Sequence, residues 1–168
     1  EVPGNIGDGR LYGATLDLTA PLDWMMLKNA RLQSSATVRD SSVTDPVTGR
    51  TRDFTGRPDL FYELEFRQDF PDRKASWGLE LAKSDLSRDF GLDEVSLFSA
   101  ETEFNVYVET TMLKGVKARF EVNDVINAAN TRERTVYAGS RATAPPLFHE
   151  FRRNNNGGGL RLKLSGTF

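Results

Sequence analysis

The sequence predicts an all-β fold: an antiparallel up-and-down meander of about seven or eight strands that forms part of a transmembrane β-barrel. The first observation behind this prediction is the alternation of apolar and polar residues. That spacing puts the apolar side chains on one side of a strand but would scatter them around a helix. The second is that short and long connections alternate along the chain, which is typical of spanning barrels. The third is the aromatic terminal residue, Phe168, which follows an alternating stretch.

Seven stretches alternate clearly, and turn residues bound each of them. In the last stretch Leu160, Leu162 and Leu164 share one face, while Arg161 and Lys163 occupy the other. The predicted strands are, in chain order, residues 12–19, 31–39, 60–67, 75–82, 103–109, 116–123 and 160–168, with a weaker pair at 133–138 and 147–152.

The connections differ in length. Short ones with Pro, Asp, Asn or Gly lie at 21–29, 71–73 and 113–115, and long polar ones at 41–57, 84–97 and 125–159. Alternation puts all short turns on the side of the C-terminus, which is the periplasmic side of such a barrel, and all long loops on the other. The Asn- and Gly-rich run at 154–159 is predicted to be a mobile loop tip.

Composition narrows the function classes. The 168 residues fit one domain, and 22 Lys+Arg against 24 Asp+Glu give a net charge of −2, so there is no general electrostatic case for binding nucleic acid. The absence of Cys excludes disulfides, thiolate zinc sites and a thiol nucleophile. No run approaches the ~18 apolar residues of a spanning helix. The mean hydropathy of −0.48 does not exclude a membrane barrel, whose strands show lipid only alternate residues.

The polar faces leave two interpretations open. Their charged residues would meet water outside a soluble barrel, or line a wet interior if the apolar face met lipid. These residues are Asp17, Arg31, Arg39, Glu63, Glu65, Arg67, Glu80, Glu103, Glu109, Lys117, Arg119, Glu121, Arg161 and Lys163. Aromatic residues near strand ends favour lipid, because interfacial girdles need that placement. They are Tyr12, Trp24, Phe61, Phe70, Trp77 and Phe168.

Three stretches carry a family resemblance: Gly4–Gly13 followed by Leu16-Asp17-Leu18, Phe120–Asn127, and Gly159–Phe168. Together they resemble the C-terminal part of a TonB-dependent outer-membrane receptor. The chain departs from the usual pattern at Val125-Ile126-Asn127, where Leu-Phe-Asp is common, and in its long last loop. Leu160, Leu162 and Leu164 with Phe168 resemble the C-terminal signature by which the barrel-assembly machinery recognises outer-membrane barrels.

The resemblance implies a barrel of about 22 strands in the bacterial outer membrane, with an N-terminal plug. It implies energy-coupled uptake of a scarce nutrient such as a ferric siderophore, with outer-membrane lipid as surroundings. Contact with the inner-membrane energy-transducing complex would be made through a motif that residues 1–168 do not contain. Seven strands cannot close that barrel, so we expect residues 1–168 to be its C-terminal portion, without the plug.

Candidate site residues are few. Outer-loop arginines are predicted to contact an anionic ligand such as a metal chelate, with lipopolysaccharide phosphates or no partner as open alternatives: Arg50, Arg52, Arg57, Arg88, Arg132, Arg134 and Arg141. His149 has no nucleophile elbow near it, so we expect no enzyme. His149 and Glu150 would point to opposite faces of a strand, so a surface histidine in a loop is expected rather than a metal site. The acids at 85, 89, 93 and 94 lack calcium-loop spacing and read as a solvated loop, and no cofactor is predicted.

Two other functions remain open. A complete eight-stranded outer-membrane protein, counting a strand in 133–152, would have a structural or adhesive role. A soluble β-barrel carrier or sandwich would enclose a hydrophobic ligand with its apolar face. Closure at eight strands would favour the first, and solubility as a monomer without detergent would favour the second.

Overall fold

The computed structural model of the chain describes residues 7–113, 115–155 and 157–166. These residues form antiparallel strands and two single-turn 3₁₀ helices, η1 (Asp23–Met25) and η2 (Pro71–Arg73). The all-β antiparallel prediction is therefore confirmed. The strands are β1 (Gly9–Pro21), β2 (Ala30–Thr44), β3 (Thr51–Arg52), β4 (Leu60–Phe70), β5 (Ala75–Ser84), β6 (Ser87–Phe90), β7 (Glu94–Ala100), β8 (Glu103–Leu113), β9 (Val116–Asn123), β10 (Ala129–Tyr137), β11 (Pro146–Asn155) and β12 (Gly159–Gly166).

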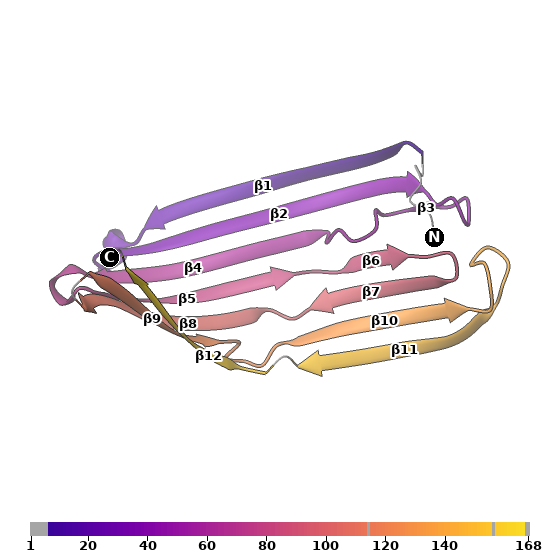
Figure 1. The fold of residues 1–168 in the computed structure, drawn as a ribbon. Coiled ribbons are helices and arrows are strands. Elements are labelled where there is room, and N and C mark those ends of the chain that lie inside the picture. The colour runs from indigo at the N-terminus through magenta and orange to yellow at the C-terminus, as the bar shows by residue number, and fades with distance from the viewer. Residues whose placement is uncertain (1–6, 114, 156, 167–168) are drawn as a thin grey trace.

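Two sheets contain these strands. The near sheet follows the order β1-β2-β4-β5-β8-β9-β12, with β3 paired to the end of β2. The far sheet follows the order β11-β10-β7-β6. Figure 1 shows that β6, β7, β10 and β11 continue β5, β8, β9 and β12 lengthwise, so the far sheet is an extension of the near one.

The register shows how the two sheets join. Ala82 pairs with Glu103 in the near sheet and Ser87 with Phe98 in the far sheet, so five residues separate the pairs on both strands. The two ladders therefore keep the same register across the gap between them. The step from β9 to β10 differs. Asn123 pairs with Gly159 and Ala129 with Asn155, so six residues separate the two pairs on this strand and four on the neighbouring one. The two extra residues are taken up where Asp124 and Asn127 have positive φ, 50° and 57°.

The far sheet corrects the loop predictions. The connections predicted at 84–97 and 125–159 instead contain β6, β7, β10 and β11. The weak pair at 133–138 and 147–152 is confirmed, since Glu133 pairs with Phe151. These strands lengthen the meander and add no eighth strand beside the seven of the near sheet. Of the Asn/Gly run, Asn154 and Asn155 end β11 and Gly159 begins β12, so these described residues belong to strands and not to a loop tip; the connection between β10 and β11 lies at 138–145.

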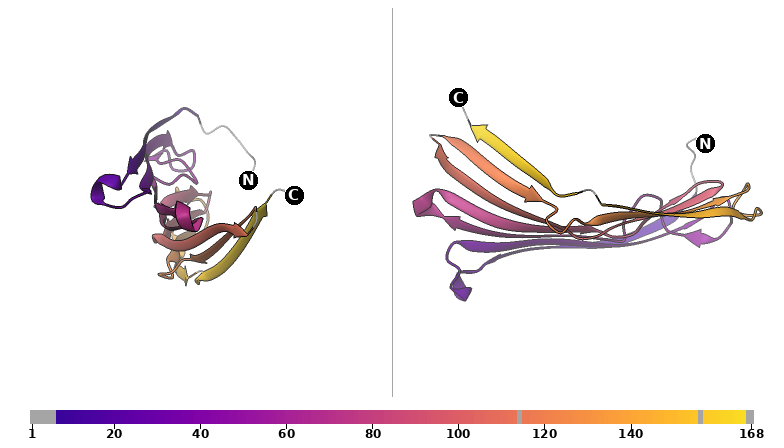
Figure 2. Two further views of the ribbon diagram at one scale, coloured as in Figure 1. Left: turned by 90° about the vertical axis from the view of Figure 1, so that its left-hand side faces the viewer. Right: turned by 90° about the horizontal axis from the view of Figure 1, so that it is seen from below.

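The meander is curved and open. Figure 2 shows an arched sheet whose two edges, β1 and β12, are not paired with each other. Cross-strand partners put all predicted apolar positions on one face: Leu79, for example, lies between Phe66 and Val106. This face is convex and exposed, with Leu160 74% accessible. The opposite, polar face is concave and crowded, since Tyr107 there is only 1% accessible.

The ends of the sheet agree in part with the prediction. The short turns at η1, η2 and Gly115 all lie at one end, and the longer connections at 45–59 and 138–145 lie at the other. Most of the aromatic positions follow the expected placement: Tyr12 and Phe70 are exposed on the convex side, Trp77 shares that face, and Trp24 is exposed in η1. Phe61 also lies near a strand end, as the second residue of β4, but on the polar, concave face, where it pairs with Thr37 and Ser84. Phe168 lies outside the described residues.

Candidate functional site

Ion pairs cross the concave face of the near sheet. Glu109 of β8 lies 3.0 Å from Arg67 and 2.8 Å from Lys117, on strands at either side of it. Arg119 of β9 lies 2.6 Å from Glu80 and 2.9 Å from Glu121. The strand period of two brings these groups onto one face, and register puts opposite charges beside each other. The part of the predicted polar face that spans β4, β5, β8 and β9 thus carries ion pairs that cross from strand to strand.

Tyr107 forms the centre of this network. Its hydroxyl donates a hydrogen bond to Glu65 Oε1 at 2.7 Å, and the Arg119 guanidinium lies 3.6 Å from its ring centroid. Its ring covers Gly78, where an added Cβ would meet Tyr107 and lie 2.6 Å from the Phe66 carbonyl oxygen. Glycine is therefore required at 78 by close approach of both backbone and ring.

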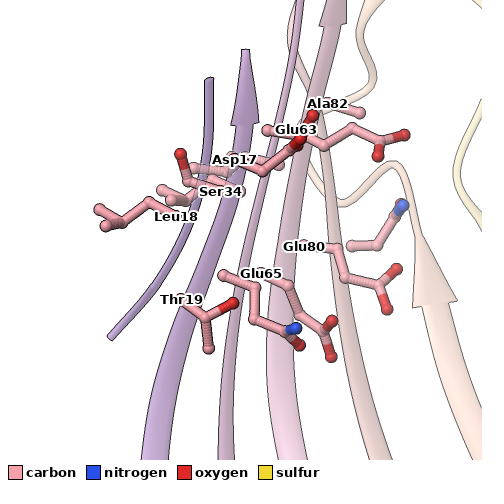
Figure 3. Close-up of a pocket in the computed structure, with 13 residues that line it drawn as sticks. Asp17, Leu18, Thr19, Ser34, Glu63, Glu65, Glu80 and Ala82 are labelled. Atoms are coloured by element: carbon pink, nitrogen blue, oxygen red, sulfur yellow. The ribbon is translucent and has the colours of Figure 1, made fainter. Parts of the chain in front are cut away.

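Charge is divided across the concave face. A hollow of about 500 Å³ lies over β1, β2, β4, β5 and β8, and its charged lining consists of Asp17, Glu63, Glu65 and Glu80 (Figure 3). A second hollow of about 350 Å³ lies toward β12 and contains the basic side chains Lys117, Arg119, Arg161 and Lys163 beside three glutamates. The first hollow therefore favours cationic groups, and the second can accept anionic ones.

A buried aspartate ties the far ends together. Asp45, 2% accessible, follows β2 and accepts a hydrogen bond from the Val47 N–H. It lies 2.9 Å from Arg141 and 3.5 Å from Arg52, and both guanidinium groups lie over the Phe90 ring. Two connections, 45–59 and 138–145, thereby meet at one carboxylate beside the Phe90 ring of β6. We call Asp45, Arg52, Arg141 and Phe90 the Asp45 cluster.

The electrostatics of Asp45 follow from these contacts. Burial alone would raise the pKa of Asp45. The Val47 N–H and the two guanidinium groups outweigh burial and hold that pKa below its ordinary value. Asp45 was not predicted as important. The Asp45-Pro46…Gly49 spacing signals a turn, but nothing local signals the distant Arg141.

The seven predicted arginines fall into two groups. Arg52 and Arg141 bind Asp45, Arg88 lies 2.8–2.9 Å from Asp53 and Asp59, and Arg132 and Arg134 bind Glu94. These five are engaged in ion pairs on at least two different faces. Arg50 and Arg57 are exposed and have no ion pair among the described residues. The structure thus does not bring the seven together into one ligand site.

The other candidate groups are dispersed. His149 lies in β11 rather than in a loop, with Nδ1 2.9 Å from Thr135 Oγ1, and Glu150 pairs with Arg134 on the opposite face. The acidic run is not one solvated loop: Asp89 lies in β6, while Glu94 begins β7 and binds two arginines. Within the described residues no three His, Asp or Glu side chains form a metal-binding group.

The proposed insertion signature is partly visible. Leu160, Leu162 and Leu164 are exposed on the convex face of β12, and Phe168 lies outside the described residues. No helix in the described part of the chain is both long and apolar enough to span a membrane. Comparison with known proteins gives no match: no family model, no curated protein and no solved structure is significantly similar to the chain.

Proposed function

We propose that the chain forms wall strands of an outer-membrane β-barrel and serves the energy-coupled uptake of a scarce nutrient such as a ferric siderophore. One observation carries the barrel part: the convex face of the near sheet is apolar and exposed across seven strands. Leu16, Val108 and Leu162 from three parts of the meander are 68%, 53% and 66% accessible. Apolar surface of this extent needs a cover, and on a convex face the cover lies outside.

Curvature separates the alternatives. A soluble carrier needs the apolar side chains on the concave face, where a ligand could be enclosed. Here the concave face instead carries Glu109, Arg119 and their partners, which suits a wet interior. An eight-stranded closed barrel is not favoured, because β10 and β11 extend existing strands.

Strand length also supports a membrane. β4 and β8 contain 11 residues each, and a tilted transmembrane strand needs about 9–11. Trp24 and Phe70 at the short-turn end and Tyr12 toward the other end would lie near the two interfaces.

The uptake part rests on the family resemblance and on the exposed loops at the far end. Arg50 and Arg57 are the predicted ligand contacts whose guanidinium groups remain exposed without ion pairs among the described residues. An anionic chelate would meet these two before the arginines already bound to carboxylates. A strain lacking the protein should then lose growth on one ferric chelate under iron limitation. Unchanged growth on every chelate tested would contradict uptake.

The first experiment measures sedimentation and molar mass of the purified chain with and without detergent. We expect association or precipitation in buffer and a defined species in micelles, since the convex face and both sheet edges are uncovered. A monodisperse monomer in buffer that binds no micelles would contradict a membrane wall. It would favour the soluble carrier instead.

A further inference from the structure

Three arginines form a row on the far sheet: Arg132 and Arg134 on β10 and Arg152 on β11, which we call the arginine row. Arg132 and Arg152 are directly opposite each other in the strand pair. Glu94 lies 3.1 Å from Arg132, and Glu150 lies 2.9 Å from Arg134 and 2.7 Å from Arg152. Two carboxylates therefore offset three guanidinium groups.

Register assigns the row to the convex face. Ala82 and Glu103 are concave, and the next pair in the same register, Ser87 and Phe98, lies five residues farther along both strands. An odd number of steps reverses the face, so Phe98 is convex. Arg132 pairs with Phe98, and Arg152 pairs with Arg132, so the row shares that face. It lies on the same side as the exposed leucines, just beyond them.

The row retains unused capacity for an anion. Like charges directly opposite each other on a strand pair repel, and an anion between Arg132 and Arg152 would relieve this. The Nε–H groups of Arg132 and Arg134 are buried and have no acceptor among the described residues, so an anion would meet only the Nη groups of these arginines. Arg152 is the most accessible, with 58% of its side chain exposed. Phe98 and Phe148 lie 5.3 Å and 5.6 Å from the guanidinium groups of Arg132 and Arg134 and fix their positions.

We propose that the arginine row binds the phosphate groups of lipids whose acyl chains cover the apolar convex face. This rests on the proposed function, because only a bilayer around the near sheet puts headgroups at the height of the row. The main argument is that both features lie on one face. The apolar surface ends near Leu81 and Phe104, and the first guanidinium group beyond it is that of Arg132, the partner of Phe98. Guanidinium groups bind phosphate oxygens with two parallel hydrogen bonds.

The test titrates the chain in nonionic detergent micelles with dioleoyl phosphatidic acid, and native mass spectrometry reports the affinity. The double variant Arg132→Gln/Arg152→Gln should bind about 25-fold more weakly, since each arginine near an anionic lipid surface contributes a factor of about 5. The matched control is Arg153→Gln, adjacent in sequence but on the concave face beside Glu101. We expect it to leave the affinity unchanged.

The lipid arms identify the source of binding. Dioleoylglycerol, which lacks phosphate, should bind weakly to wild type and variant alike. Equal loss in Arg153→Gln and the double variant would overturn the proposal in favour of bulk charge, as would unchanged affinity in the double variant. Pyrophosphate binding as tightly as the lipid would overturn it in favour of a soluble anion.

Failure of the two proposals is distinguishable. A chain that enters no micelle contradicts the membrane wall and the lipid site together. A chain that enters micelles but does not prefer phosphatidic acid to dioleoylglycerol contradicts the lipid site alone. Gel mobility before and after heating verifies folding of each variant. Should the double variant misfold, Arg152→Gln alone, at the most accessible position, should still weaken binding about 5-fold.

Discussion

The near and far sheets share strands but differ in what their convex faces carry. Leu64, Leu81 and Phe104 are neighbours on the convex face of the near sheet. Farther along the same ladder that face carries Ser96, Arg132 and Glu150. The strands therefore run on past the point at which the convex face changes from apolar to charged side chains. The face to which a side chain points depends only on whether its position along the strand is odd or even. The same meander can therefore carry apolar residues on one stretch of a face and charged residues on the next.

The largest expected effect comes from charge on each convex face. Leu79→Arg, at the middle of β5 between Phe66 and Val106, should destabilise the folded state in lipid by about 2–4 kcal/mol, because it puts a guanidinium into hydrocarbon. Val136→Arg, on the convex face of the far sheet opposite Glu94, should cost less than about 1 kcal/mol. Urea titration of the folded fraction in lipid vesicles measures both.

Ala82→Arg is the control on the concave side of the same strand, next to the acidic hollow. We expect a change within about 0.5 kcal/mol. Equal losses for Leu79→Arg and Val136→Arg would remove the distinction between the two sheets.

The Asp45 cluster should respond to pH. Because folding lowers the pKa of Asp45, its contribution to stability is complete above the unfolded pKa of about 3.9 and is lost as the pH falls through the folded value. Asp45→Asn should cost about 2–3 kcal/mol locally at neutral pH by leaving Arg52 and Arg141 unpaired. Hydrogen exchange at the 45–59 and 138–145 connections measures this loosening.

Loosening of those connections should leave the near sheet protected, because Asp45 lies beyond it. Asp40→Asn, an acidic-to-amide change on the same strand away from the cluster, is the matched control. A loss of protection in β4 and β8 at the same pH would show that the two regions unfold as one.

Gly78→Ala should destabilise the near sheet by about 1–3 kcal/mol, since the added methyl group meets both Tyr107 and the Phe66 carbonyl. Gly139→Ala, where the added Cβ would make only an ordinary contact 3.6 Å from Ala144, should change stability by less than about 0.5 kcal/mol. Unfolding of both variants in the same micelles gives the difference. Equal stability would mean that Tyr107 does not cover Gly78.

The smallest effect is expected from Tyr107→Phe. It keeps the ring between Gly78 and Arg119 and removes the hydroxyl that donates to the Glu65 carboxylate, which should cost about 1.5 kcal/mol. The same unfolding titration measures this loss of stability. The control is Tyr62→Phe, which removes a hydroxyl on the convex face that forms a hydrogen bond with Thr102. A larger loss for Tyr62→Phe would contradict the central role of Tyr107.

The near sheet could be predicted because one residue class repeats with a period of two, as in Leu160 to Lys163. The far sheet was predicted only as the weak pair at 133–138 and 147–152, because Arg132, Glu133 and Arg134 put polar residues on both faces of β10 and show no alternation of hydropathy. The segments that form β6 and β7 resembled loops. Pairing with β7 and β11 stabilises these segments, and such long-range partners leave no local pattern.

For the candidate site, the sequence predicted which charged residues share a face but not which of them form ion pairs. Alternation put Glu109, Arg119 and Glu121 on one face, but the pairing partners depend on register. The outer arginines were grouped because they lie in long connections. The structure separates these arginines. Arg52 binds the buried Asp45, whereas Arg132 lies on the convex face. The predicted loops contain strands, and successive side chains of a strand point to opposite faces.

The two-residue insertion between β9 and β10 has a consequence for the length variation that the chain tolerates. An even insertion restores the original facing, so Arg132 and Arg134 keep their side of the wall despite the detour at Asp124 and Asn127. Removing a single residue there would move every later side chain of β10 to the opposite face of the sheet, although the composition of the strand would stay the same. Length changes at this junction should therefore be accepted in pairs and rejected singly.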